Sequence, residues 1–132
     1  MAHMRIPKEN AYGLKGWKLP PEVYKRARWL VADYPRIKKR YADMLTDSPD
    51  RDMVNRQSTR GDPTATIAAK REGFGRDIDA VEKALLIIPE EYRRDIYLKL
   101  TKGKPFSDLA NNNTWYHWQR VFLYYVALLR GY

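Results

Sequence analysis

The chain of 132 residues has the size of one ordinary domain, and its 44% hydrophobic content is enough for a modest core. It contains no cysteine, which excludes a disulfide framework and thiolate chemistry and is typical of a reducing cytoplasm. A net charge of +9 and a pI near 9.8 predict an anionic partner, with nucleic acid preferred over an acidic protein face or anionic lipid.

No apolar run approaches the roughly 20 residues that span a bilayer, so we expect no membrane partner. The chain has two histidines, a count that excludes a histidine-rich metal site, and we expect neither a metal nor another cofactor. Strand-like alternation and internal repeats are both missing from the sequence. We therefore predict an all-α protein, with one helical domain over residues 5–132 that forms a small bundle of about five to six helices.

Residues 5–19 are predicted to form an N-terminal arm, in which aromatic residues stand among lysines. The arm could dock on the bundle or lie along DNA, and docking is the preferred interpretation. Pro20-Pro21 then stand where proline is tolerated, at the start of a helix expected over about 20–33. Pro35 is expected to end that helix and to restart the chain as a second one.

The second helix carries the basic group Lys38, Lys39 and Arg40, which could contact the phosphates of a nucleic acid. Charges of this kind also commonly just solvate a helix face, and the sequence leaves both interpretations open. Residues 46–62 follow, polar, charged and nearly free of large apolar groups, so they are predicted to be a loop or linker.

Three more helices are expected before residue 104. Asp62 is the predicted N-cap of a third helix that runs to about residue 72, where Gly73 and Gly75 interrupt it. The fourth carries an apolar stripe with helical spacing, and the fifth begins at Pro89 and stops at Gly103. The stripe of the fourth helix, expected in the core, is formed by Ile78, Val81, Leu85 and Ile88.

Acidic residues cluster on the fourth and fifth helices but do not resemble a catalytic site. We interpret them as helix-surface acids, because no second cluster, cofactor loop or Ser/His/Asp arrangement accompanies them. The protein is therefore expected not to be an enzyme. The acids concerned are Asp77, Asp79, Glu82, Glu90 and Glu91.

Residues 104–132 are predicted to contain a helix-turn-helix-like pair, with a short element at 104–110 and a last helix capped by Thr114. Aromatic and apolar residues recur at spacings of three and four along that last helix, which is typical of a face packed on the core. This seam is formed by Trp115, Trp118, Phe122, Tyr125 and Leu129. Other apolar residues surround the far end of the helix, so it must be buried on several sides, by the domain, by a second copy or by a partner.

The first turns of the last helix hold a different kind of residue. Asn, Gln and Arg can bond base edges in the major groove, while Thr, Tyr and a helix N-terminus serve phosphates. A recognition helix makes its base contacts from its N-terminal turns. In the opposing interpretation the asparagines form a tight turn and the arginine only solvates the helix. The candidate DNA-binding residues are Asn112, Asn113, Thr114, Tyr116, His117, Gln119 and Arg120.

Several stretches resemble the RinA and ArpU type of phage late-gene transcription regulators, short proteins encoded in prophages of Gram-positive bacteria. The likeness covers about residues 35–132 and is most distinctive in the closing run. The stretches are YPRIKKRYADML, a polar SPD, GDPT, IDAVEKALLIIPEEYRRDIYLKL and TWYHWQRVFLYYVALLRG. His117 and Gln119 stand where that family usually carries Arg or Lys, and only three residues separate Ala110 from Thr114.

The resemblance implies an all-α protein of the bacterial host's cytoplasm, with a C-terminal helix-turn-helix related to sigma-factor region 4. Double-stranded DNA is the implied partner, with RNA polymerase as a candidate second partner. The alternative is a non-catalytic phage interaction module, such as a polymerase-binding or packaging accessory factor. A homodimer is compatible with a regulator that reads two half-sites.

Overall fold

The computed structural model describes residues 6–46 and 63–132. Within these residues the chain is helical, without strands, which confirms the predicted all-α class. The described part has four helices rather than the expected five to six: α1 Pro21–Thr46, α3 Pro63–Ile87, α4 Glu90–Lys102 and α5 Asn112–Arg130. None of them is both long enough and apolar enough to cross a membrane.

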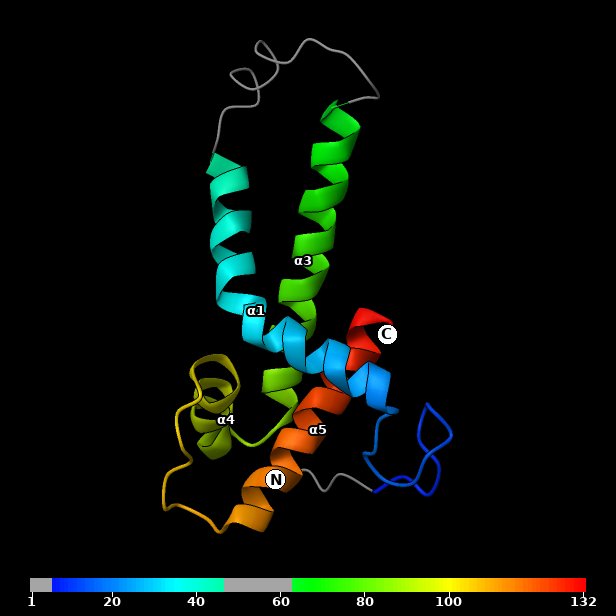
Figure 1. The fold of residues 1–132 in the computed structure, drawn as a ribbon, viewed down its shortest axis with the longest axis vertical. Coiled ribbons are helices and arrows are strands. Elements are labelled where there is room, and N and C mark those ends of the chain that lie inside the picture. Colours follow the sequence, from blue (N-terminus) through cyan, green and yellow to red (C-terminus); the bar gives the residue numbers. More distant parts are fainter. Residues whose placement is uncertain (1–5, 47–62) are drawn as a thin grey trace.

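The molecule has a helical base from which two helices project side by side (Figure 1). The projection consists of the second half of α1 and the first half of α3, and the base contains the other halves together with α4 and α5. The last helix, α5, contacts each of the other three helices. These helices cover most of the apolar residues around α5, among them Val121, Leu123 and Val126, but leave Leu128 exposed near its end.

The expectation that Pro35 divides two helices is wrong. Pro35 lies inside α1, which bends in its middle instead of ending there (Figure 1). Proline removes one backbone donor and crowds the preceding turn, which bends a helix but does not have to stop it. Tyr34 and Ile37 are both buried on either side of the proline, so core packing holds both halves in helical form.

The predicted break at Gly73 and Gly75 is also wrong, because α3 runs through both glycines. A glycine inside a helix costs about 1 kcal/mol relative to alanine, and tertiary contacts offset that cost here. Phe74 packs against the core between them. A Cβ added at Gly75 would lie 3.6 Å from the Tyr41 ring of α1, so this glycine lies where α1 packs closely against α3.

Replacing Gly73 by alanine is expected to raise the free energy of unfolding by about 0.5–1 kcal/mol. A Cβ at this position meets nothing within 4 Å, so the variant gains helix propensity without a clash. Gly103→Ala is the matched control, since that site is equally open but has a φ of 68°, and it should be destabilised. Urea unfolding followed by circular dichroism measures both, and a destabilised Gly73→Ala would contradict the prediction.

Two helix ends differ in how well they were predicted. Gly103 ends α4 in the left-handed conformation, as expected, and its backbone N–H and that of Lys104 bond the carbonyls of Lys99 and Leu98. The N-cap of α5 is Asn111 and not Thr114. Its Oδ1 accepts from the Thr114 backbone N–H at 2.9 Å, so the asparagines join the helix instead of forming a turn before it.

The expected C-terminal helix-turn-helix pair is not confirmed. Residues 103–111, which join α4 to α5, contain a turn but no helix. This segment is nevertheless ordered by contacts with α5. The Trp115 indole N–H donates to the Ser107 carbonyl at 3.1 Å, and the Phe106 ring stacks on Trp115 with 5.0 Å between centroids. Residues 103–111 are therefore held in place by packing on Trp115 and not by a helix of their own.

The aromatic seam of α5 is buried at its start and exposed at its end. Trp115 and Phe122 are fully buried, Trp118 and Tyr125 pack at the edge of the core, and Leu129 is 46% exposed. The prediction for Leu129 is therefore wrong. Of the stripe predicted before Pro89, Val81 on α3 and Ile88 just after its end are fully buried as expected, while Ile78 and Leu85 are partly buried.

The arm docks on the bundle, as preferred from the sequence. Trp17 is buried, with its ring 5.4 Å from that of Tyr124 on α5. The Ala11 backbone N–H donates to the Tyr124 hydroxyl, and the Tyr12 hydroxyl donates to the Tyr132 carbonyl. These bonds join the two ends of the described chain. The predicted loop at 46–62, apart from Thr46, and the predicted cap at Asp62 lie outside the described residues.

Candidate nucleic-acid interface

The first two turns of α5 are held rigidly by their inward face. Trp115 is enclosed between the Phe106 ring and the Tyr92 ring, which meets it edge-on at 5.1 Å. Trp118 also stacks on Tyr92, with 5.9 Å between the ring centroids. Figure 1 shows that these turns lie at the end of the molecule opposite the projection. The outward side chains of these turns therefore extend from a part of α5 that core packing holds in place.

Four of the seven predicted residues on α5 are exposed: Asn112, Asn113, Tyr116 and Arg120. Asn113, Tyr116 and Arg120 are spaced by three and four, so they share one face of the helix. We name these three residues the α5 outer face. Arg120 has no ion-pair partner among the described residues, which leaves its guanidinium available to a ligand.

The other three predicted residues are less available. The Thr114 hydroxyl donates to Asn111 at 3.1 Å. Burial, followed by the nearby positive charge of Arg120, lowers the pKa of His117 below its ordinary value, so this imidazole is neutral at pH 7. Gln119 is only 8% exposed, and its Oε1 has no hydrogen-bond partner among the described residues. Gln119 therefore does not belong to the accessible surface.

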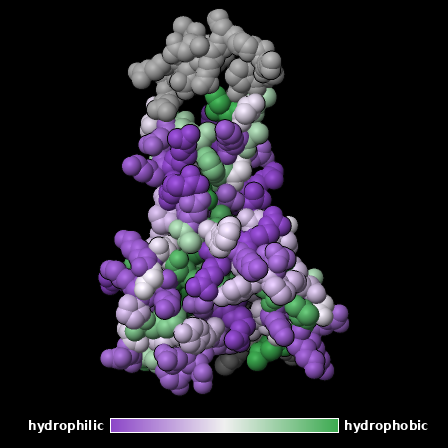
Figure 2. All heavy atoms as spheres, viewed as in Figure 1, coloured by the Kyte–Doolittle hydropathy of each residue, from purple (hydrophilic) through white to green (hydrophobic). Residues whose placement is uncertain are grey.

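The basic group on α1 lies apart from the α5 outer face. Lys38 and Lys39 line a groove of about 980 Å³ to which α1, α3 and α4 contribute and α5 does not, while Arg40 is exposed outside that lining. Because α5 contributes nothing to this groove, the basic group on α1 and the α5 outer face form separate surfaces. Hydrophilic side chains cover most of the face seen in Figure 2, and hydrophobic ones show through as separate patches.

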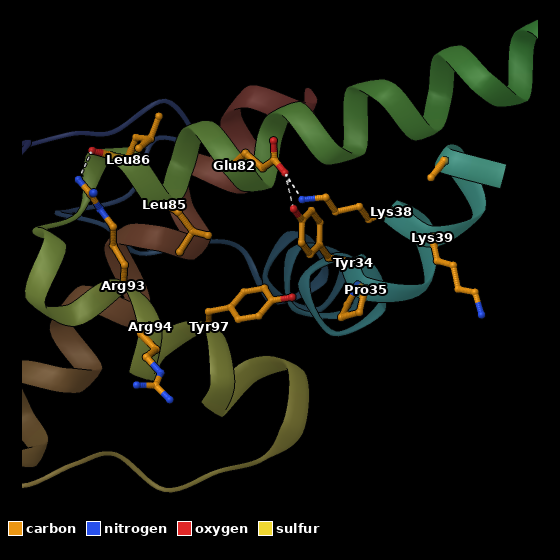
Figure 3. A pocket seen from close by; sticks show the side chains of 11 residues that line it. Tyr34, Pro35, Lys38, Lys39, Glu82, Leu85, Leu86, Arg93, Arg94 and Tyr97 are labelled. Atoms are coloured by element: carbon orange, nitrogen blue, oxygen red, sulfur yellow. Dashed lines mark hydrogen bonds and ion pairs between the residues drawn. The ribbon is translucent and has the colours of Figure 1, made fainter. Parts of the chain in front are cut away.

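Figure 3 shows how the groove is built at the bend of α1. Its lining is mostly apolar, with charged side chains along the edges, and Tyr34 of α1 meets Tyr97 of α4 edge-on with ring centroids 5.8 Å apart. The lining residues are Tyr34, Pro35, Lys38, Lys39, Ala42, Glu82, Leu85, Leu86, Arg93, Arg94 and Tyr97.

One polar cluster joins α1 to α3 at this groove. Glu82 accepts hydrogen bonds from the Tyr34 hydroxyl and, at 3.1 Å, from Lys38 Nζ (Figure 3). Burial, together with the bond to Glu82, raises the pKa of Tyr34 to about 12. The Tyr34 bond lowers the pKa of Glu82, and the bond to Glu82 raises the pKa of Lys38. At neutral pH the phenol is therefore protonated and its two partners are charged.

A second contact fixes α4 against the end of α3. Arg93 donates to the Ile88 carbonyl at 3.0 Å and to the Leu86 carbonyl at 3.1 Å. These carbonyls lie at the C-terminal end of α3, where a cation is favoured and bonding groups are left over. Arg94, the next residue, is exposed and has no ion-pair partner within the described ranges.

Sequence reasoning missed the ion pairs and hydrogen bonds that join one helix to another. Glu82 bonds Tyr34 and Lys38, and Asp77 pairs with Arg130 at the end of α5. Asp79, by contrast, pairs within its own helix, with Lys83 at 3.5 Å, as Glu72 does with Arg76. Helical spacing could place these acids on α3 but carried no information about the helix they face. No group of three or more His, Cys, Asp or Glu in the described chain is placed to hold a metal.

No protein-family model, no curated protein and no solved structure matches the chain.

Proposed function

We propose that this protein binds double-stranded DNA with the α5 outer face, as a non-catalytic transcription regulator in the cytoplasm of a bacterial host that carries the phage. The observation that supports the proposal is the division of α5 into a buried aromatic side and an exposed polar side. An α-helix with its side chains measures about 10–12 Å across and the major groove is about 12 Å wide, so the first turns of α5 can enter it.

The residues have distinct roles in this proposal. Arg120 bonds a guanine edge through its forked donors, and Asn113 bonds an adenine edge or a neighbouring phosphate. The Tyr116 hydroxyl donates to a phosphate. Lys38, Lys39 and Arg40 of α1 form a separate surface and take no part in this contact with the duplex, and Lys38 is already paired with Glu82.

Replacing Arg120 by alanine is expected to cost about 1–3 kcal/mol of affinity for a preferred duplex and little for random DNA. The preferred duplex is selected from random sequence with the parent protein, and both proteins are titrated against it and against random DNA at one stated salt concentration. Arg28→Ala is the matched control, because it removes one exposed positive charge from α1 instead of α5.

Two outcomes would overturn the regulator proposal. The first is that selection enriches no duplex at all, and the second is that Arg28→Ala lowers the ratio of specific to nonspecific affinity as much as Arg120→Ala does. Either result would leave the interaction module, with RNA polymerase or a packaging component as the partner. The elution volume with and without the selected duplex reports whether two copies bind together.

A further inference from the structure

We propose that the groove at the bend of α1 is a docking site for an acidic amphipathic helix of a partner protein. The proposal rests on the shape, apolar lining and charge of that groove and does not depend on DNA reading by α5.

The groove exists because two helices diverge at the bend. α1 turns at Pro35, and α4 is held by Arg93 against the end of α3. The Tyr34 and Tyr97 rings, in edge-on contact, close the gap between α1 and α4. All the elements that form the groove are thus fixed by hydrogen bonds or ring contacts, so a ligand meets a preformed surface.

The surface inside the groove is apolar and unusually exposed. Leu86 is 67% exposed, and Leu85, Pro35 and Ala42 belong to the same lining. Burying a leucine side chain fully is worth about 1.5–3 kcal/mol relative to leaving it in water. An apolar lining between helices fits the apolar face of an amphipathic helix, which places side chains at i, i+3, i+4 and i+7.

Charges along the edges select the partner. The lining contains four basic side chains, Lys38, Lys39, Arg93 and Arg94, and the single acid Glu82. Glu82 is already neutralised by Lys38, and Arg93 is held by backbone carbonyls. Lys39 on α1 and Arg94 on α4 have no ion-pair partner in the described chain and stand on different walls (Figure 3). They are placed to meet carboxylates that flank an apolar stripe.

Other occupants fit less well. A small molecule is buried to roughly 70–90% in its site, whereas exposed side chains such as Lys39, Leu86 and Arg94 border this groove. A second copy of the chain carries a net charge of +9 and would be repelled from a basic groove. Nucleic acid satisfies the charges but leaves the leucines without an apolar partner.

The probe is a labelled helix-forming peptide with leucines on one face and glutamates beside them, titrated by fluorescence anisotropy. We expect it to bind at least about tenfold more tightly than two control peptides, one with lysine in place of glutamate and one with serine in place of leucine. Arg94→Glu and Leu86→Gln should each weaken binding about tenfold. Arg120→Ala, on α5, should leave it unchanged.

The proposal would be overturned by unchanged binding in both groove variants, by a loss in Arg94→Glu without one in Leu86→Gln, or by displacement of the peptide by single-stranded oligonucleotide. The second would indicate simple charge attraction, and the third a nucleic-acid site. Self-association that Leu86→Gln abolishes would point to a second copy and would also overturn it. Both residues are exposed, and circular dichroism checks the folding of each variant, with Leu86→Ala as the replacement if Leu86→Gln unfolds.

Discussion

Replacing Trp115 by alanine is expected to lower the free energy of unfolding by about 3–5 kcal/mol, the usual cost of removing a buried large aromatic side chain. Trp115 is fully buried, stacks on Phe106 and meets Tyr92 edge-on. Its indole also donates the hydrogen bond to Ser107. Removal of the indole therefore leaves a cavity and also leaves the Ser107 carbonyl without its hydrogen-bond donor. Urea unfolding followed by circular dichroism measures the change.

Trp29→Ala is the matched control for this experiment. Trp29 lies on α1 and is 75% exposed, so its removal should change stability by no more than about 0.5 kcal/mol. In the Trp115 variant, amide exchange should accelerate first in residues 103–111, since this segment is held by the tryptophan and not by a helix of its own. Equal stability of the two variants would show that Trp115 does not support the start of α5.

The second large effect is expected at Asn10. Its Nδ2 donates to the carbonyls of Gly16 and Lys18 at 3.0 and 2.8 Å, and its Oδ1 accepts from the backbone N–H groups of Tyr12 and Leu14 at 2.8 and 3.2 Å. One buried side chain thus organises the whole docked arm. At about 0.5–1.5 kcal/mol for each of the four bonds, Asn10→Ala is expected to lose about 2–6 kcal/mol.

Asn10→Asp separates hydrogen bonding from shape. Aspartate keeps the two accepting contacts but cannot donate, and it places a carboxylate against the Gly16 and Lys18 carbonyls, so it should destabilise the protein as well. Limited proteolysis should then cut within residues 5–19 before the helical base. If Asn10→Ala unfolds at the same urea concentration as the parent, the arm is not held by this side chain.

The elements that could be predicted are those governed by neighbouring residues. Gly103 ends α4 because only a residue that tolerates a positive φ can occupy that position. The spacing of Val81 and Ile88 identified a core face, because a helix repeats its faces every three to four residues. Breaks at Pro35 and Gly73 were predicted from the same local preferences, and there tertiary packing outweighed a cost of only a few kcal/mol.

The candidate surface was predictable to a similar degree. Residue type and position were enough to propose Asn113, Tyr116 and Arg120, which the structure exposes on one face. Gln119 looked equivalent in the sequence but is buried. Spacing describes how the residues of one helix are arranged, and only the neighbouring helices decide which of its faces they cover.

By itself, the sequence determined the all-helical class, the buried aromatic side of α5 and the excess of positive charge, because composition and periodicity act within one segment. Three other features depend on how the helices pack: Pro35 bends α1, Glu82 joins Tyr34 to Lys38, and α1, α3 and α4 leave a basic groove between them. Those features arise where segments far apart in the chain meet, and the free energy of such contacts is settled by packing and not by the residues on either side.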